Sequence, residues 1–183
     1  MRPRQALARQ ALAGLIVVFG PMPGRMSVFR LEGEAVYENI LITTDGSELA
    51  GKGVRHGLVL AERLGAKVTF LSVVEPLLPE AIRAAIAGGI EDPVGGYDQQ
   101  IDSSMKQRYA ALEKEAAQYG VSVDIVHEID ENPAEAIVRF AEMKGCDLIV
   151  MTSHGRRGIR KALLGSQTAE VLVHTSIPVL VIR

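Results

Sequence analysis

Residues 148–168 read Leu-Ile-Val-Met-Thr-Ser-His-Gly-Arg-Arg-Gly-Ile-Arg-Lys-Ala-Leu-Leu-Gly-Ser-Gln-Thr, and this stretch decides the fold. The unbroken apolar run at 148–151 is typical of a central strand in a parallel sheet, where both faces are buried. A loop of glycine and basic residues follows it, and Gly165 with Ser166 then begins a helix that we expect to end near His174. A strand that leads through such a loop into a helix is the repeating unit of α/β proteins.

Four other short runs of strand-forming residues flank this unit, at 40–43, 68–74, 121–125 and 179–182. Apolar and polar residues alternate in the run at 121–125, which predicts an edge strand. Apolar residues recur every three or four positions at 50–64, at 105–119 and from Pro133 onward, which predicts helices between the strands. We therefore predict an open five-stranded parallel sheet with helices on both faces.

The expected ends of these helices follow from capping residues. Gly65 and Gly120 end the first two helices, and Gly145 ends the third. Asn132 and Glu135 surround Pro133 in the pattern of a capping box, in which the two side chains bond to each other's backbone.

Residues 77–102 are the least regular part of the chain, because Pro79, Pro93 and two Gly-Gly pairs interrupt the pattern. We expect a mobile excursion with one short helix at 80–87.

The composition restricts the classes of function. The 183 residues carry a formal net charge of −2, so no global field favours nucleic acid or an anionic membrane. Tryptophan is absent and aromatic residues make up 4% of the chain, which disfavours a stacking surface for single-stranded nucleic acid. A single cysteine, Cys146, cannot form an internal disulfide, in keeping with a reducing compartment. We therefore expect a cytoplasmic protein that partners neither nucleic acid nor membranes.

Residues 1–35 differ from the remainder of the sequence. Arg2, Arg4 and Arg9 precede an apolar run at 11–19 that is too short to span a bilayer, which takes about 20 residues. A basic segment followed by a short apolar run resembles a signal peptide, but no small-x-small cleavage site follows before the break at 20–24. We expect residues 1–35 to be a disordered or loosely docked extension of a folded domain at 36–183. A second hypothesis is that translation starts at Met22 or Met26.

The glycine-containing loop and the helix after it predict an anion site. Gly155 permits close approach of a ligand to the backbone, and Gly165 with Ser166 begins a helix whose first N–H groups have no internal partner. Unpaired N–H groups and the positive end of the helix dipole favour phosphate. The hydroxyls of Ser166 and Thr168 are further donors, and the loop itself supplies Arg156, Arg157, Arg160 and Lys161. The alternative is that Gly165 turns the chain, Ser166 caps the helix and the basic loop is solvated.

The strand order 3-2-1-4-5 would bring a second loop to this anion site. In open α/β sheets, ligands bind beyond the carboxyl ends of the strands where the winding direction reverses, here between the first and fourth strands. The loops that meet there are 43–47 and 152–155. Asp45 is a candidate partner for a nucleoside hydroxyl, an amine or phosphate-bound Mg²⁺. It serves equally well, with Ser47, as a helix cap.

At these residues the chain from about Val36 to Arg183 resembles the universal stress protein family. The resemblance lies in 40–47, in Val73-Val74-Glu75-Pro76, in 146–151, in Ser153-His154-Gly155 with Gly165-Ser166, and in 177–181. It implies a Rossmann-like fold of the adenine nucleotide alpha hydrolase type, adenine-nucleotide binding, frequent dimerisation and a role in stress tolerance.

The ATP-binding branch of that family carries Gly-x-x-Gly, nine residues, then Gly followed by Ser or Thr. Gly155 matches the second glycine and Gly165-Ser166 match the end, but Thr152 stands where the first glycine belongs. The resemblance implies ATP as the ligand, with or without Mg²⁺, and the Thr152 side chain is expected to crowd the ribose and weaken binding. The implied ligand-binding set is Thr43, Thr44, Asp45, Val73, Thr152, Ser153, His154, Gly155, Arg156, Gly165, Ser166, Gln167 and Thr168.

Three functions follow in order of preference. The first is a stress-response regulatory protein that binds ATP or another adenine nucleotide. The second is a nucleotide-independent interaction module of the same fold, and the third is a slow ATPase. We assign no catalytic residue, because Ser166 has no base near it in the sequence, and no metal site, because the four histidines lack metal-ligand spacing. A homodimer through the final strand is also expected, since an open apolar edge invites antiparallel pairing with a second copy.

Overall fold

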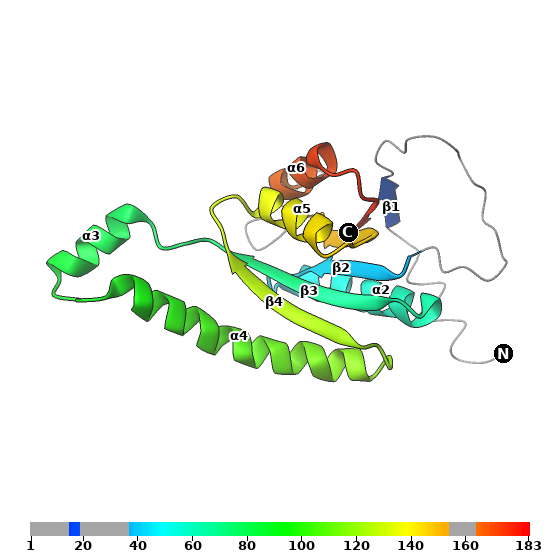
Figure 1. Ribbon diagram of the computed structural model, residues 1–183, viewed down its shortest axis with the longest axis horizontal. Helices are drawn as coiled ribbons and strands as arrows, with labels where there is room; N and C mark the ends of the chain where they lie inside the picture. Colours follow the sequence, from blue (N-terminus) through cyan, green and yellow to red (C-terminus); the bar gives the residue numbers. More distant parts are fainter. Residues whose placement is uncertain (1–14, 19–36, 154–163) are drawn as a thin grey trace.

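The computed structural model describes residues 15–18, 37–153 and 164–183 (Figure 1). Within these ranges, six strands form one sheet in the order β1-β6-β5-β2-β3-β4. The strands are β1 (Leu15–Val18), β2 (Asn39–Thr43), β3 (Lys67–Val74), β4 (Val123–Ile129), β5 (Leu148–Thr152) and β6 (Val179–Ile182). Strands β2 to β6 pair in parallel, which confirms the predicted five-stranded order.

The strands are buried according to their place in the sheet. Ile40, Leu41 and Ile42 of the central strand β2 have no exposed surface, and the neighbouring β5 is buried at 148–151. Strand β4 lies at one edge of the sheet and is only partly buried, as its alternating sequence predicts. The continuous apolar runs therefore form the middle of the sheet.

Helices cover both faces of the sheet, as expected. On one face, α2 (Glu48–Leu64) and the end of α4 (Pro93–Ala117) pack on β2, β3 and β5 through residues such as Val54, Leu58 and Ala116. On the other, α5 (Pro133–Met143) and α6 (Ser166–His174) pack through Phe140 and Val171. Figure 1 shows these helices on either side of the strands.

The predicted caps are correct for α2. Helix α5 starts as predicted, with Asn132 at the N-cap and Pro133 first in the helix, but its capping box does not form. The Ser47 hydroxyl accepts a hydrogen bond from the Ala50 N–H at 3.1 Å, and Gly65 ends α2 in the left-handed conformation, with φ +69°. The Asn132 side chain makes no cap hydrogen bond, so the predicted capping box is wrong. The Asp130 carboxylate instead accepts the Asn132 N–H at 2.8 Å and shapes the turn before α5.

The short helix expected at 80–87 is confirmed, but the expectation of irregular chain from Pro93 to residue 102 is wrong. Helix α3 spans Pro79–Ala87, and α4 already begins at Pro93 and includes both Gly95 and Gly96. Each helical glycine costs about 1 kcal/mol relative to alanine. The Asp92 carboxylate offsets part of this cost by accepting the Gly95 N–H at 2.9 Å, and burial of Ile101 farther along α4 adds stability.

Strand β1 adds a feature that the sequence analysis did not predict. It pairs antiparallel with β6, with Leu15 opposite Ile182 and Val18 opposite Val179. The edge of β6 that was expected to be open is therefore covered by a segment of the same chain. The proposed boundary at residue 36 stays a prediction, since most of residues 1–35 lie outside the described ranges. Among the described residues no helix is long and apolar enough to cross a membrane.

Candidate functional site

A cavity of about 780 Å³ lies beyond the carboxyl ends of β2, β3 and β5. This is the point where the winding direction of the sheet reverses, as expected for an open α/β sheet. Nine of the thirteen predicted ligand-binding residues line it: Thr43, Thr44, Asp45, Val73, Thr152, Gly165, Ser166, Gln167 and Thr168. Ser153 is not part of the lining, and His154, Gly155 and Arg156 lie outside the described residues.

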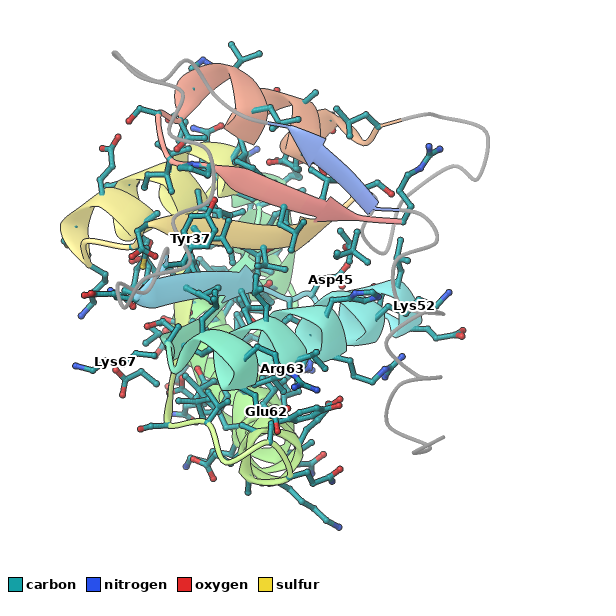
Figure 2. All side chains as sticks on the ribbon, turned by 90° about the vertical axis from the view of Figure 1, so that its right-hand side faces the viewer. Tyr37, Asp45, Lys52, Glu62, Arg63 and Lys67 are labelled. Atoms are coloured by element: carbon teal, nitrogen blue, oxygen red, sulfur yellow. The ribbon has the colours of Figure 1, made fainter. Side chains whose placement is uncertain are left out.

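Strand β3 holds the loop after β2 in place. The Thr44 N–H donates to the Leu71 carbonyl at 3.0 Å, and the Ser72 hydroxyl donates to the Thr44 carbonyl at 2.8 Å. These two hydrogen bonds fix the backbone immediately before Asp45. Figure 2 labels Asp45 beyond the end of β2, and Lys67, at the start of β3, at the other end of the sheet.

Asp45 shapes the turn before α2 and lines the cavity, while Ser47 is the helix cap. One oxygen of its carboxylate, Oδ1, accepts the Ser47 N–H at 2.9 Å and shapes the turn into α2. The same residue lines the cavity. A carboxylate oriented by its own loop is well placed to accept a hydrogen bond from a hydroxyl or an amine.

The start of α6 differs from the prediction at two donors. The Gly165 N–H, expected to face a ligand, donates to the Ser153 carbonyl at 2.7 Å. The Thr168 hydroxyl donates to the Thr152 carbonyl at 3.0 Å and is buried. A hydroxyl has one hydrogen to donate, so Thr168 does not offer it to a phosphate here. Both donors instead fix α6 to the end of β5.

Among the described residues, the donors left for the predicted anion site are those of the first turn of α6, while Gly155 and the basic residues at 156–161 lie outside the described ranges. The first helical bond runs from the Ala169 N–H to the Gly165 carbonyl at 3.0 Å. Within the ranges that the structure covers, no carbonyl accepts from the N–H groups of Ser166, Gln167 or Thr168. Because all three residues line the cavity, the positive end of the α6 dipole faces it.

Helix α4 forms a wall of the cavity that the sequence analysis missed. Its contribution is Tyr97, Gln100, Ile101, Ser104, Met105 and Arg108. Arg108 donates to the Asp45 carbonyl at 3.2 Å, and the Tyr97 hydroxyl donates to the Glu75 carbonyl at 2.8 Å. The spacing of three and four residues along one helical face is the signal that could have revealed this wall.

The remaining titratable groups of the described residues form no second cluster suited to chemistry. Burial and then the neighbouring Asp147 raise the pKa of the Cys146 thiol to about 11, which is the behaviour of an inert packed cysteine. Among the described residues, no group of three or more His, Cys, Asp or Glu side chains is arranged to hold a metal ion. The candidate site is therefore a binding cavity with a helix N-terminus on one side and Asp45 on the other.

The model of the Universal stress protein family matches residues 36–183 of this chain. The chain belongs to the universal stress protein family. Universal stress protein MJ0531 of Methanocaldococcus jannaschii is 30% identical over 155 residues, which cover 82% of this chain and 85% of that protein.

Solved structures of universal stress proteins share the fold. The structure of MJ0577, a universal stress protein of the same archaeon, superposes with a TM-score of 0.68 at 28% identity, covering 80% of this chain and 96% of that one. A universal stress protein solved in complex with cAMP has a TM-score of 0.59 at 20% identity, covering 80% of this chain and 97% of that one. The Rossmann-like, adenine nucleotide alpha hydrolase-like fold is thereby confirmed.

Proposed function

We propose that this universal stress protein binds ATP or another adenine nucleotide in the cavity beyond β2, β3 and β5, and that occupancy regulates a stress response. The observation that carries the proposal is the convergence of Asp45, Val73 and the first turn of α6 on one cavity. Its volume of about 780 Å³ lies within the range of about 300–1,000 Å³ typical of small-molecule sites.

The chemistry of the lining supports a phosphorylated ligand. The N–H groups of Ser166 and Gln167 lie in the first turn of a helix, where phosphate binds favourably. Arg108 lines the same cavity and carries a fixed positive charge. The backbone of Val73 and the carboxylate of Asp45 would meet the nucleoside, as the family resemblance implies. The structure solved with cAMP supports an adenine nucleotide as the ligand class.

The test is a titration of the purified chain with ATP, ADP, AMP and cAMP by calorimetry, with a Ser166→Asp variant beside the wild type. An acidic residue in the first turn of a helix favours the helix itself, so the variant should remain folded. The same charge repels a phosphate at that turn. We expect the dissociation constant for ATP to rise about tenfold or more, which corresponds to about 1.4 kcal/mol.

Ser122→Asp is the matched control. Ser122 is exposed and precedes β4 at the opposite end of the sheet, so the identical change in charge should leave ATP affinity unaltered. Equal affinity in the wild type and the Ser166→Asp variant would reject the assignment of the phosphate site. A thermal shift in millimolar Mg-ATP provides a second measurement, since a saturating ligand stabilises by RT ln(1 + [L]/Kd).

One observation favours the nucleotide-independent module as a second candidate. The Gly165 N–H and the Thr168 hydroxyl are both satisfied within the chain and not available as donors. If calorimetry detects no heat of binding and millimolar Mg-ATP gives no thermal shift, this second function replaces the first. For the proposed regulatory protein we expect ATP turnover below about one per second, the low end of ordinary enzymes.

A further inference from the structure

Strand β6 would be the edge of the sheet if β1 were absent, and its sequence suits pairing with another apolar strand. It is a run of four aliphatic residues, Val179-Leu180-Val181-Ile182, and it pairs in parallel with β5 on one side. Its other side would be an exposed ladder of N–H and C=O groups, and apolar edges of this kind pair with other chains. In a twofold antiparallel pair, Val179 of one copy would lie opposite Ile182 of the second.

Strand β1 occupies that position within the same chain. The residues opposite Ile182, Val181, Leu180 and Val179 are Leu15, Ile16, Val17 and Val18, in antiparallel register. A second copy of β6 would place Val179, Leu180, Val181 and Ile182 at those four positions. Every position is therefore aliphatic in both arrangements, and β1 has the direction and residue type of a second copy's β6.

From this equivalence we propose that β1 is an intramolecular cap, which competes with a second copy of the chain for the edge of β6. With β1 docked, the edge is closed and the chain does not dimerise there. When β1 leaves, the edge opens and two copies pair through β6. The cap has an advantage, because two segments of one chain meet at an effective concentration of the order of millimolar. The proposal concerns association only and does not depend on nucleotide binding.

A disulfide across the β1–β6 pair tests where β1 lies. In the Cys146→Ala background, Val17→Cys with Leu180→Cys places two thiols directly opposite each other. Opposed residues of an antiparallel pair have Cα atoms about 4.5–5.5 Å apart, within the range that a disulfide bridges. We expect mild oxidation to give a bond within one chain, seen as a faster band on a non-reducing gel. Leu15→Cys with Leu180→Cys is the matched control, because diagonal neighbours are about 7–8 Å apart and should crosslink poorly.

The competition itself is tested by molar mass in solution. We expect the oxidised Val17/Leu180 cysteine variant to be monomeric at every concentration measured by light scattering. A full-length Ile16→Pro/Val17→Pro variant cannot maintain the β1 ladder and should dimerise at a concentration at least about tenfold lower than the wild type. Adding Leu180→Pro to that variant should return it to monomer, which attributes the dimer to the edge of β6.

Three results would overturn the proposal. They are a disulfide that forms only between chains, a dimer that persists when the cap is locked, and a proline variant that stays folded by circular dichroism yet remains monomeric. If the proline variants fail to fold, the oxidised Val17/Leu180 cysteine variant still decides the question through its molar mass.

Discussion

Thr152 is the residue where this chain departs from the ATP-binding pattern of its family, and its neighbours show how the departure is accommodated. A Cβ atom placed on Gly53 of α2 would lie 2.8 Å from the Thr152 methyl carbon, so the methyl group occupies space that Gly53 leaves open. The Thr152 carbonyl accepts the Thr168 hydroxyl. The side chain therefore packs towards α2 while the backbone positions α6, which lessens the crowding of a ribose expected from the sequence.

Cys146 gives a prediction at the same scale. Its pKa is raised to about 11, first by burial and then by the charge of Asp147. An unfolded cysteine has a pKa near 8.5, so at pH 8.5 the native chain should react with iodoacetamide on the order of 100-fold more slowly than the urea-unfolded chain. Mass spectrometry of timed samples measures both rates. Equal rates would contradict the burial of this thiol.

The raised pKa of Cys146 also sets a direction for stability against pH. The folded state retains the thiol proton that the unfolded state loses above about pH 8.5. The contribution of Cys146 is therefore fully present below that pH, and it declines as the pH rises towards about 11. The difference in unfolding free energy between wild type and Cys146→Ala should shrink over that interval, as measured by urea titration.

At the scale of the element, α2 contains two glycines that should respond oppositely to alanine. A Cβ on Gly57 would collide with Ile42 of β2, meeting its Cγ1 at 2.9 Å and its Cδ1 closer still. Overpacking costs about 1–3 kcal/mol, whereas the helical preference of alanine returns about 1 kcal/mol. We expect Gly57→Ala to lower the free energy of unfolding by up to about 2 kcal/mol, as measured in urea.

Gly51→Ala is the control in the same helix. There the nearest atom to the added carbon is Nη1 of Arg55 at 3.7 Å, an ordinary contact. This variant should gain about 0.5–1 kcal/mol from helix preference alone. If both substitutions stabilise the protein to the same extent, the close packing of α2 on β2 is not as the structure has it.

Elements were predicted correctly where the apolar pattern and the flanking turn or capping residues indicate the same structure. They were missed where these two signals conflict. The parallel strands combine apolar runs with flanking turn residues, so the site residues 43–45 follow from the end of β2, and Gly165-Ser166 marked the start of α6. Helix α4 begins with a Gly-Gly pair that argues against a helix, while the Asp92 cap and the buried Ile101 argue for it. Its wall of the cavity mixes Tyr97, Gln100 and Arg108 with apolar residues, so no hydrophobic stripe marked it.

Strand β1 escaped prediction for a different reason. Its four residues are as apolar as those of β6, but a run that short is equally compatible with a loop or a signal-like segment. Only the register with β6 identifies it as a strand. Pairing partners that lie at opposite ends of the chain leave no local trace in the sequence.

At the scale of the whole molecule, stability should be unevenly distributed. Helix α3 has no buried residue, and Figure 1 shows it projecting beyond the sheet, whereas β2 and β5 are enclosed by helices on both faces. Hydrogen exchange followed by mass spectrometry should show that the α3 amides exchange through local opening, far faster than those of β2. Equal protection of α3 and β2 would mean that α3 is held by contacts that the structure does not contain.

The attachment of α4 at the rim of the cavity has a consequence for evolution. Tyr97 and Arg108 donate hydrogen bonds to the main-chain oxygens of Glu75 and Asp45. A main-chain oxygen remains when its side chain is replaced, so a substitution of Glu75 or Asp45 would keep both acceptors. Side chains that line the cavity at these two positions can accordingly vary in evolution while the main-chain acceptors for α4 are inherited unchanged.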